Sequence, residues 1–227
     1  MSDATRLLLV GAAGRMGKAV AAAVAKDSGL TIVGRIERGG ALEPALDNCD
    51  VVIDFSLPEA TEAVCRACAA KGRPLVLGTT GPNAAQKASI AAAAEKIPLV
   101  YAANFSVGVN ALFALTRRAA ALSGNNFDVE VIEMHHRTKK DAPSGTAKRL
   151  LEILQEVRDG GEIPAHSVRA GDIVGEHTVL FAGPGERLEL THRAASRETF
   201  ALGALRAARW VVSQPAGLYS MENVLGL

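Results

Sequence analysis

The sequence predicts an α/β protein of two domains, a parallel sheet with helices on both faces and then a smaller α+β domain with an open mixed sheet. Three observations predict it. Hydrophobic residues make up 48% of the 227-residue chain, enough for a sizeable core. Short apolar runs alternate with helical stretches through residues 1–105, which is typical of parallel sheets. After Asn104 the alternation stops, and a long helix is followed by strand-like segments.

The strands of the first domain are expected to be short and buried, because each is an apolar run bounded by polar or glycine-containing segments. Ligands of such sheets bind beyond the carboxyl ends of the strands, so the loops that follow are candidate binding segments. The strands are expected at Leu7–Val10, Leu30–Ile36, Val51–Phe55, Pro74–Leu77 and Leu99–Ala102. The candidate loops begin at Gly11, Glu37, Phe55, Gly78 and Ala103.

Three helices are expected between these strands, at Gly14–Ala25, from Ser56 to about Lys71, and at Ala84–Lys96. The second helix has a start signal, Ser56-x-x-Glu59 with Pro58, and the glycine that follows Lys71 should end it.

The second domain is expected to combine helices with a hairpin. Ser144–Val157 has apolar residues at helical spacing, and Gly183-Pro184-Gly185 should connect two antiparallel strands. The remaining helices are expected at Val107–Leu122 and Thr199–Val212, and the strands at Asp128–His135, His166–Ala170, His177–Ala182 and Arg187–His192. The tail after Gln214 is expected to return to the first domain. The predicted domains are therefore residues 1–105 with 214–227, and residues 106–213.

Composition argues against several classes of function. A formal net charge of +1 gives no field that would attract nucleic acid or an anionic membrane. The segment Met1–Arg6 is polar, Leu7–Val10 is too short for a signal peptide, and no stretch reaches the ~20 apolar residues of a membrane span, so a cytoplasmic protein is expected. Cys49, Cys65 and Cys68 lack a second Cys or His pair at zinc-site distance, so no metal is expected and the thiols are interpreted as reduced packing residues.

The segment Gly11-Ala-Ala-Gly14-Arg-Met-Gly17 joins the first strand to the first helix. Glycines allow a tight turn and close approach of backbone to a pyrophosphate, which the helix N-terminus then attracts. The spacing is G-x-x-G-x-x-G, so a packing turn is the alternative interpretation. Glu37 follows about 20 residues later, where an acid binds the adenosine ribose, although it could also be a solvated surface acid. Arg38 could meet a 2′-phosphate, so use of both NADH and NADPH is expected.

The segment Glu133–Ala147 contains the densest chemistry in the chain. His135 and His136 close a strand and should face opposite sides, so one can act as an acid in a cleft. Lys139 follows in a loop, and Ser144-Gly145-Thr146 opens a helix that can hold an anion. This combination suits a small anionic substrate that must be protonated. The alternative is a solvated or nucleic-acid-binding basic loop.

The sequence resembles the dihydrodipicolinate reductases. Their pattern E-x-H-H-x-x-K-x-D-x-P-S-G-T-A matches at every fixed position from Glu133 to Ala147. Four more segments match in family order and extend the resemblance over nearly the whole chain: residues 11–17, 78–81, 102–110 and 169–177.

The resemblance implies a Rossmann-like dinucleotide domain, a substrate-binding domain that also assembles a homotetramer, and reduction of a small dicarboxylate with NADH or NADPH in lysine and diaminopimelate biosynthesis. By the same resemblance His135 donates the proton, and Lys139 holds the substrate and assists. The implied substrate site is His136, Ser144, Gly145 and Thr146. The implied dinucleotide site is Gly11, Ala12, Ala13, Gly14, Arg15, Met16, Glu37, Arg38, Gly78, Thr79, Thr80, Ala102, Ala103, Asn104 and Phe105.

The chain departs from the family pattern by being shorter in two places, between Gly40 and Val51 and between Arg158 and His166. These gaps leave the candidate catalytic residues in place but bear on the size of the first sheet and on assembly. Two other functions compete with the resemblance: another oxidoreductase of the same architecture, such as an aspartate- or homoserine-type dehydrogenase, and a non-catalytic nucleotide-sensing domain. Neither accounts for the His-His…Lys…Pro-Ser-Gly-Thr segment.

Overall fold

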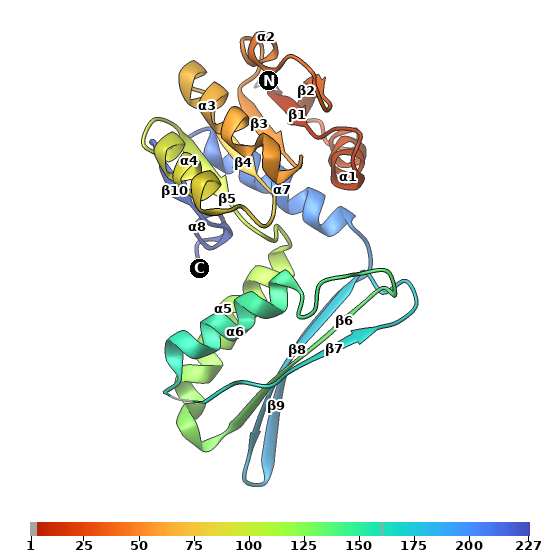
Figure 1. Ribbon diagram of the computed structural model, residues 1–227, viewed down its shortest axis with the longest axis vertical. Helices are drawn as coiled ribbons and strands as arrows, with labels where there is room; N and C mark the ends of the chain where they lie inside the picture. Colours follow the sequence, from red (N-terminus) through yellow and green to blue (C-terminus); the bar gives the residue numbers. More distant parts are fainter. Residues whose placement is uncertain (1–3, 160) are drawn as a thin grey trace. The chain divides into compact units, whose positions relative to one another are not determined.

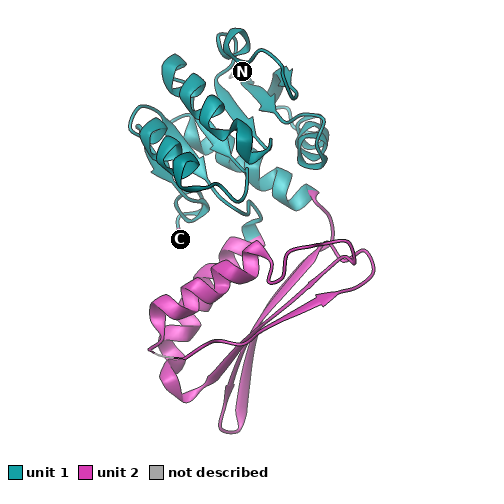
Figure 2. Ribbon diagram, viewed as in Figure 1, with its two compact units in different colours: residues 1–107, 198–226 teal, residues 108–197, 227 magenta. Residues whose placement is uncertain are grey.

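A computed structural model describes residues 4–159 and 161–227 (Figure 1). Residues 1–3 of the polar N-terminal stretch, and Gly160 in the shortened segment after Arg158, lie outside the described residues. The chain forms two compact units, residues 1–107 with 198–226 and residues 108–197 (Figure 2). Among the described residues, no helix is long and apolar enough to cross a membrane.

The first unit contains a six-stranded parallel sheet with the order β10-β5-β4-β3-β1-β2. The sixth strand comes from the C-terminal tail, which returns to this sheet as expected. Because all strands run the same way, their carboxyl ends and the loops that follow lie at one edge. The strands are β1 (Thr5–Val10), β2 (Leu30–Ile36), β3 (Val51–Asp54), β4 (Leu75–Leu77), β5 (Pro98–Tyr101) and β10 (Gly217–Tyr219).

The two faces of this sheet build separate cores. In β1, Leu7 and Leu9 pack into the core formed with α1 and α7, whereas Leu8 and Val10 pack into the core formed with α3 and α4. Successive side chains of a strand point to opposite faces, so a fully apolar strand is what a sheet covered on both sides requires. The helices are α1 (Arg15–Val24), α2 (Leu42–Leu46), α3 (Thr61–Lys71), α4 (Ala84–Ala94), α7 (Glu198–Val211) and α8 (Met221–Leu225).

The shortened region after Gly40 contains a short helix that the sequence analysis did not assign, α2, and Leu46 of this helix is fully buried. One local prediction in this unit is corrected. Ser56 does not cap a helix: a 3₁₀ turn, Pro58–Ala60, precedes α3 without a side-chain cap, and the Ser56 hydroxyl has no partner among the described residues. Gly72 ends α3 in the left-handed conformation, as expected.

The helix α7 belongs to the first unit, whereas the sequence placed it in residues 106–213. It packs against α1 and lies near β3, β4 and β5. Its apolar stripe, which includes Ala204, Ala208 and Val211, is fully buried in the same core as α1. The boundary between the compact units therefore lies before Glu198, because burial against the first sheet decides where this helix packs.

Replacing Gly203 of α7 with Ala is expected to destabilise the first unit. A Cβ built there lies 1.8 Å from the backbone oxygen of Phe105, so helix or loop must move. Overpacking of this kind costs about 1–3 kcal/mol or more. Thermal unfolding would measure the effect as a lower Tm. The control is Leu202→Ala, since Leu202 is 53% exposed on the same helix and its truncation should leave Tm nearly unchanged. Equal Tm values for the two variants would contradict the packing described.

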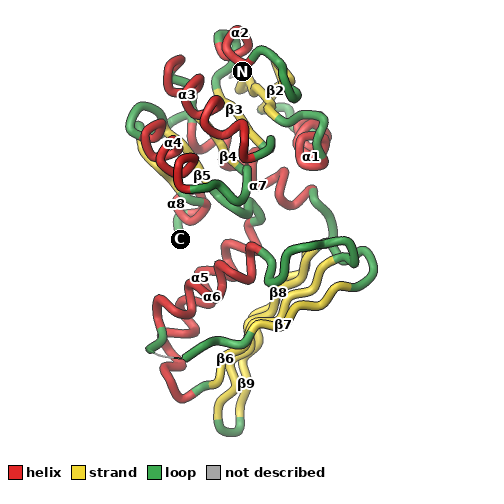
Figure 3. Tube along the Cα trace, viewed as in Figure 1, coloured by secondary structure: helices red, strands yellow, loops and turns green. Residues whose placement is uncertain are grey.

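The second unit is a four-stranded sheet in the order β7-β6-β8-β9 with two helices on one face (Figure 3). The β6–β7 pair is parallel and the other pairs are antiparallel, so the sheet is mixed, as expected. Its core lies between the sheet and α5 and α6. The elements are α5 (Val107–Ser123), a 3₁₀ turn (Gly124–Asn126), β6 (Asp128–His135), α6 (Gly145–Val157), β7 (Ala165–Arg169), β8 (Gly175–Gly183) and β9 (Glu186–Ala194).

Candidate functional site

The glycine loop lies between β1 and α1, as the sequence predicts. Gly11 has a φ of +77°, and a Cβ at this position would lie 2.7 Å from the backbone of Phe55, so only glycine is accommodated. Gly14 is the N-cap of α1. The free backbone N–H groups and the positive end of the helix dipole at Gly14 form an anion-binding position beside the sheet edge.

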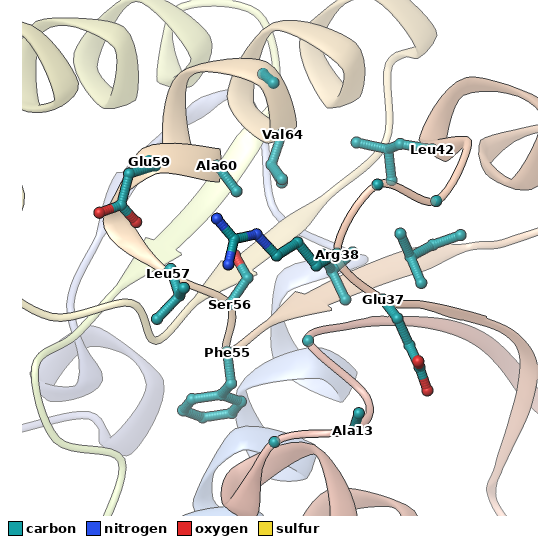
Figure 4. A pocket seen from close by; sticks show the side chains of 17 residues that line it. Ala13, Glu37, Arg38, Leu42, Phe55, Ser56, Leu57, Glu59, Ala60 and Val64 are labelled. Carbon is teal, nitrogen blue, oxygen red and sulfur yellow. The ribbon is translucent and has the colours of Figure 1, made fainter.

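A cavity of about 520 Å³ extends from this loop past the end of β2 (Figure 4). Its lining includes the predicted residues Gly11, Ala13, Gly14, Glu37 and Arg38. In Figure 4 the Arg38 side chain reaches across the cavity toward Ser56, while the Glu37 side chain extends in a different direction from Arg38. The volume is within the usual range of cofactor sites.

The cavity also has an apolar wall that sequence reasoning did not name residue by residue. The loop after β3 was identified as a candidate only by its first residue, Phe55. The wall is formed by Phe55, Leu57, Ala60, Ala63 and Val64, with Ile36 and Leu42. Such a surface suits a flat, weakly polar ring next to the polar groups at Glu37 and Arg38. The feature of the sequence that could have pointed to these wall residues was the position of their loop at the carboxyl end of a central strand.

The two remaining loops of the predicted dinucleotide site follow β4 and β5 at the same sheet edge. Thr79 is buried and its hydroxyl donates to the Ser56 carbonyl oxygen at 3.3 Å. The Phe105 ring packs edge-to-face on Phe55, with centroids 5.6 Å apart. These contacts join the loops to the loop after β3. The cavity lining itself does not include Ala12, Arg15, Met16, Gly78, Thr79, Thr80, Ala102, Ala103, Asn104 or Phe105.

In the second unit the two adjacent histidines separate as predicted. His135 is the last residue of β6 and is only 8% exposed, whereas His136 is partly exposed and its Nδ1 lies 2.8 Å from the Thr138 hydroxyl. Strand alternation puts Glu133 on the same face as His135. The His135 Nδ1 is hydrogen-bonded to the Glu133 carboxylate.

Glu133 is fully buried, and burial alone would raise its pKa. Hydrogen bonds from Arg169, Ser167 and His135 outweigh this and lower the pKa to about 2, so the carboxylate is ionised. Burial lowers the pKa of His135, and the hydrogen bond to Glu133 partly offsets the fall. His135 is therefore neutral over much of the range near pH 7 but can be protonated next to a fixed negative charge.

Ser144 links the start of α6 to a second buried histidine. Its Oγ accepts the Ala147 N–H at 3.2 Å, which makes Ser144 the N-cap, and lies 3.0 Å from His177 Nε2. Burial lowers the pKa of His177 to about 3, so its ring is neutral and the serine hydroxyl can donate to it. The His177 ring also packs edge-to-face on His135, at a centroid distance of 5.2 Å. Sequence reasoning did not assign His177 or Glu133 to the site.

Lys139 lies in the loop between β6 and α6, with its side chain 20% exposed and its Nζ 2.8 Å from Asp141 Oδ1. Gly145 and Thr146 form the first turn of α6, directly after the Ser144 cap. The second unit thus brings together a buried histidine, a lysine cation and a helix N-terminus, the groups expected for an anionic substrate that accepts a proton. Among the described residues, no cluster of His, Cys, Asp or Glu is arranged to hold a metal ion.

Comparisons with known proteins cover both units. Residues 5–105 match the family model "Dihydrodipicolinate reductase, N-terminus", and residues 108–225 match "Dihydrodipicolinate reductase, C-terminus". The chain is 48% identical to the 4-hydroxy-tetrahydrodipicolinate reductase of Akkermansia muciniphila over 240 residues, covering 97% of this chain and 98% of the relative. It is 45% identical to the 4-hydroxy-tetrahydrodipicolinate reductase of Alkalilimnicola ehrlichii over 265 residues, covering 98% of this chain and 99% of the relative.

A solved structure is similar over nearly the full length. It is described as a dipicolinate-bound dihydrodipicolinate reductase from Paenisporosarcina sp. TG-14. The TM-score is 0.83 at 26% sequence identity, and the match covers 97% of this chain and 99% of the other. The predicted arrangement, a parallel α/β unit followed by a mixed-sheet α+β unit, is confirmed by the structure and by this match.

Proposed function

This chain belongs to the dihydrodipicolinate reductase family, and we propose that it reduces 4-hydroxy-tetrahydrodipicolinate to tetrahydrodipicolinate with NADH or NADPH, with His135 as the proton donor. The chain is thus an oxidoreductase of lysine and diaminopimelate biosynthesis. The observation that supports the proton-donor role best is the buried His135 on an ionised carboxylate, beside Lys139 and the α6 N-terminus. The rival sensing function gives no reason for these groups to lie together.

The first unit fits a dinucleotide. The cavity runs from the N-terminus of α1, which suits a pyrophosphate, to Glu37 and Arg38, which suit an adenosine ribose with or without a 2′-phosphate. Its apolar wall suits the adenine ring. The nicotinamide, when bound, supplies a hydride to a conjugated carbon of the substrate ring. We propose that the loops after β4 and β5 complete this site.

The second unit supports binding of a diacid. The N–H groups of Gly145 and Thr146 lie in the first turn of α6, where the helix dipole favours a carboxylate. Lys139 adds a full positive charge, and the substrate carboxylate would compete with Asp141 for it. We propose His136 as a further substrate contact, because it is partly exposed in the same loop. Hydride addition leaves negative charge on the ring, which Lys139 stabilises and His135 neutralises.

The test is oxidation of NADH and of NADPH in the presence of the preceding synthase, which makes the substrate from pyruvate and aspartate semialdehyde. Oxidation that requires the synthase is the expected result. Both cofactors are expected to work, because Glu37 and Arg38 both line the cavity, with kcat/KM values that differ by less than about a thousandfold, or ~4 kcal/mol. No oxidation by protein that binds NADH would contradict the proposed reaction.

A second measurement separates the reductase from a nucleotide-sensing domain. Pyridine-2,6-dicarboxylate, a flat mimic of the ring diacid, is expected to raise Tm, and to raise it further when NADH is present. Ligand binding to the folded state raises the free energy of unfolding by mass action. A Tm that responds to NADH alone would favour the sensing function.

We propose that the enzyme assembles as a homotetramer through the uncovered face of its second sheet. The helices α5 and α6 cover one face (Figures 1 and 3). The other face presents partly exposed apolar side chains, Ile132, Met134 and Val168 among them. Open apolar sheet faces are typical of subunit interfaces. Sedimentation of the purified chain measures its assembly state, and a monomer would contradict the proposal.

We place the enzyme in the cytoplasm. Cys49, Cys65 and Cys68 are free and buried, and burial raises the pKa of Cys65 to about 12, so these thiols are unreactive packing residues. Free thiols of this kind are usual in reducing compartments. Fractionation of cells would test the location.

A further inference from the structure

The His135 ring is held in one orientation by the residues around it. Nδ1 is bonded to Glu133, and the edge-to-face contact with His177 fixes the plane of the ring. On the third side, a Cβ added to Gly175 would lie 3.0 Å from His135 Nε2, so the glycine lets β8 pass close to this atom. With Nδ1 engaged, Nε2 is the nitrogen that can face a substrate.

Both oxygens of Glu133 are engaged by fixed donors. Oε1 accepts from Arg169 Nη2 at 2.6 Å and from the Ser144 backbone N–H at 3.2 Å. Oε2 accepts from Arg169 Nη1 at 2.9 Å and from His135. The paired guanidinium contact is a bidentate, charge-assisted geometry that leaves the carboxylate little freedom to rotate. A fully buried carboxylate held by these donors has a fixed orientation behind the His135 ring.

We propose that Glu133, locked by Arg169, is the positioning carboxylate of this active site: it keeps the proton of neutral His135 on Nδ1 and thereby makes Nε2 the atom that delivers the catalytic proton. This inference rests on the proposed reductase function and deepens it. Glu133 touches neither substrate nor cofactor, and it acts through His135.

Arg169 also connects this carboxylate to the lysine loop. Its Nη2 donates to the Asp141 carbonyl oxygen at 2.6 Å, and Asp141 pairs with Lys139 through its side chain. The neighbouring backbone contact, Ala170 N–H to the His135 carbonyl oxygen at 2.9 Å, ties the end of β7 to the end of β6. One guanidinium thus fixes both the carboxylate behind His135 and the loop that carries Lys139.

The charged and titratable groups around His135 act in opposite directions. Glu133 on the same strand favours the protonated ring, whereas Arg169 on β7 and Lys139 in the loop disfavour it, as does burial. His177 on β8 is neutral near pH 7, since its pKa is about 3. Glu133 is therefore the group that keeps protonated His135 accessible near neutral pH.

The proton from His135 completes the reduction that the hydride begins. The hydride brings an electron pair to a ring carbon, and negative charge develops on the conjugated atom beside it. The Nε2–H bond of His135 breaks, the proton joins that atom, and its electron pair stays on Nε2. His135 is left as the neutral tautomer with its proton on Nδ1, which the Glu133 hydrogen bond stabilises.

The test is Glu133→Gln, which keeps the shape of the side chain and removes its charge. Its matched control is Glu152→Gln, because Glu152 is an exposed carboxylate of the same unit, on α6, that pairs with Arg149 at 3.0 Å away from His135 and from the uncovered sheet face. In E133Q the kcat–pH profile is expected to fall off at lower pH, and kcat at neutral pH to drop roughly 10- to 100-fold, part of the 10²–10⁴ that a general acid supplies. KM should change little. E152Q should behave as wild type.

Nitrogen-15 NMR of the imidazoles supplies a readout that needs no substrate. In E133Q the His135 titration is expected to move to lower pH, and its neutral tautomer to lose the preference for Nδ1–H. Leaving Arg169 unpaired is expected to destabilise the single variant, so the double variant E133Q/R169Q, which removes both charges of the pair, is measured in parallel. It should show the same loss of tautomer preference and a smaller shift of the titration to lower pH, because Arg169 disfavours the protonated ring.

An unchanged His135 titration and kcat–pH profile in the folded variants would overturn the positioning role. The role would also be overturned if the loss of activity were fully explained by the fraction of unfolded protein while the kcat–pH profile stayed unchanged. These outcomes differ from failure of the reductase function itself, which would appear as an inactive wild-type enzyme in the synthase-coupled assay.

Discussion

Replacing His135 with Gln is expected to lower kcat by roughly 10²–10⁴, the usual contribution of a positioned general acid. Glutamine approximates the size of the ring and can still bond to Glu133, but it has no proton to deliver at neutral pH. The KM for the diacid should change much less, because the proposed carboxylate contacts lie on Lys139 and the α6 N-terminus. Initial rates in the synthase-coupled assay measure both constants.

The pH dependence of the same enzyme checks the assignment independently. The proton donor must be charged, so kcat should fall as the pH rises through the pKa of His135. Burial holds that pKa below its usual value despite the opposing carboxylate, so the fall should begin on the acid side of an ordinary histidine. The residual activity of H135Q should not show this fall of kcat with rising pH.

The matched control is His166→Gln. His166 is a partly exposed histidine on β7 that pairs with Glu130, away from the site. His166 lies on the sheet face proposed for assembly and not among the site residues, so its loss should leave the pH dependence of kcat in its wild-type form. Near-normal turnover in H135Q, or an equal loss in both variants, would end the assignment of His135 as the donor.

Replacing Lys139 with Ala is expected to lower kcat by a similar factor, roughly 10²–10⁴, and in addition to raise KM. The lysine charge is proposed both to hold a substrate carboxylate and to stabilise the negative charge that hydride addition creates. kcat/KM should therefore fall further in K139A than in H135Q. The comparison of the two constants distinguishes a residue that binds and assists from one that only donates the proton.

Lys140 offers the control for this prediction. It has the same charge, follows Lys139 directly in the loop, and has an exposed side chain. Lys140→Ala removes the same charge from the loop without removing the amine that pairs with Asp141. A wild-type kcat in K139A would contradict the role of Lys139, and equal losses in the two variants would show that the loop contributes only a general positive field.

Local patterns in the sequence determined most of the fold. The fully apolar strand Leu7–Val10 predicted a sheet covered on both faces, and the structure confirms it, because Leu7 and Leu8 pack into different cores. The glycines from 11 to 17 predicted a turn into a helix, and Gly11 has the positive φ that such a turn requires. Strand alternation likewise predicted that His135 and His136 would separate. Each of these features depends on neighbours a few residues apart.

The tertiary structure alone decided which distant segments meet. Arg169 reaches Glu133 because β7 pairs with β6 in a register that aligns His135 with Arg169, 34 positions along the chain. His177 reaches Ser144 across the antiparallel β6–β8 pair and the start of α6. The helix α7 packs in the first unit because its apolar stripe is buried there, with Gly203 close to the Phe105 backbone. The periodicity of a sequence shows which face of a helix or strand is apolar. Which element packs against that face, and in which strand register, depends on how whole surfaces pack. The residues that support His135 could therefore be identified only in the folded chain.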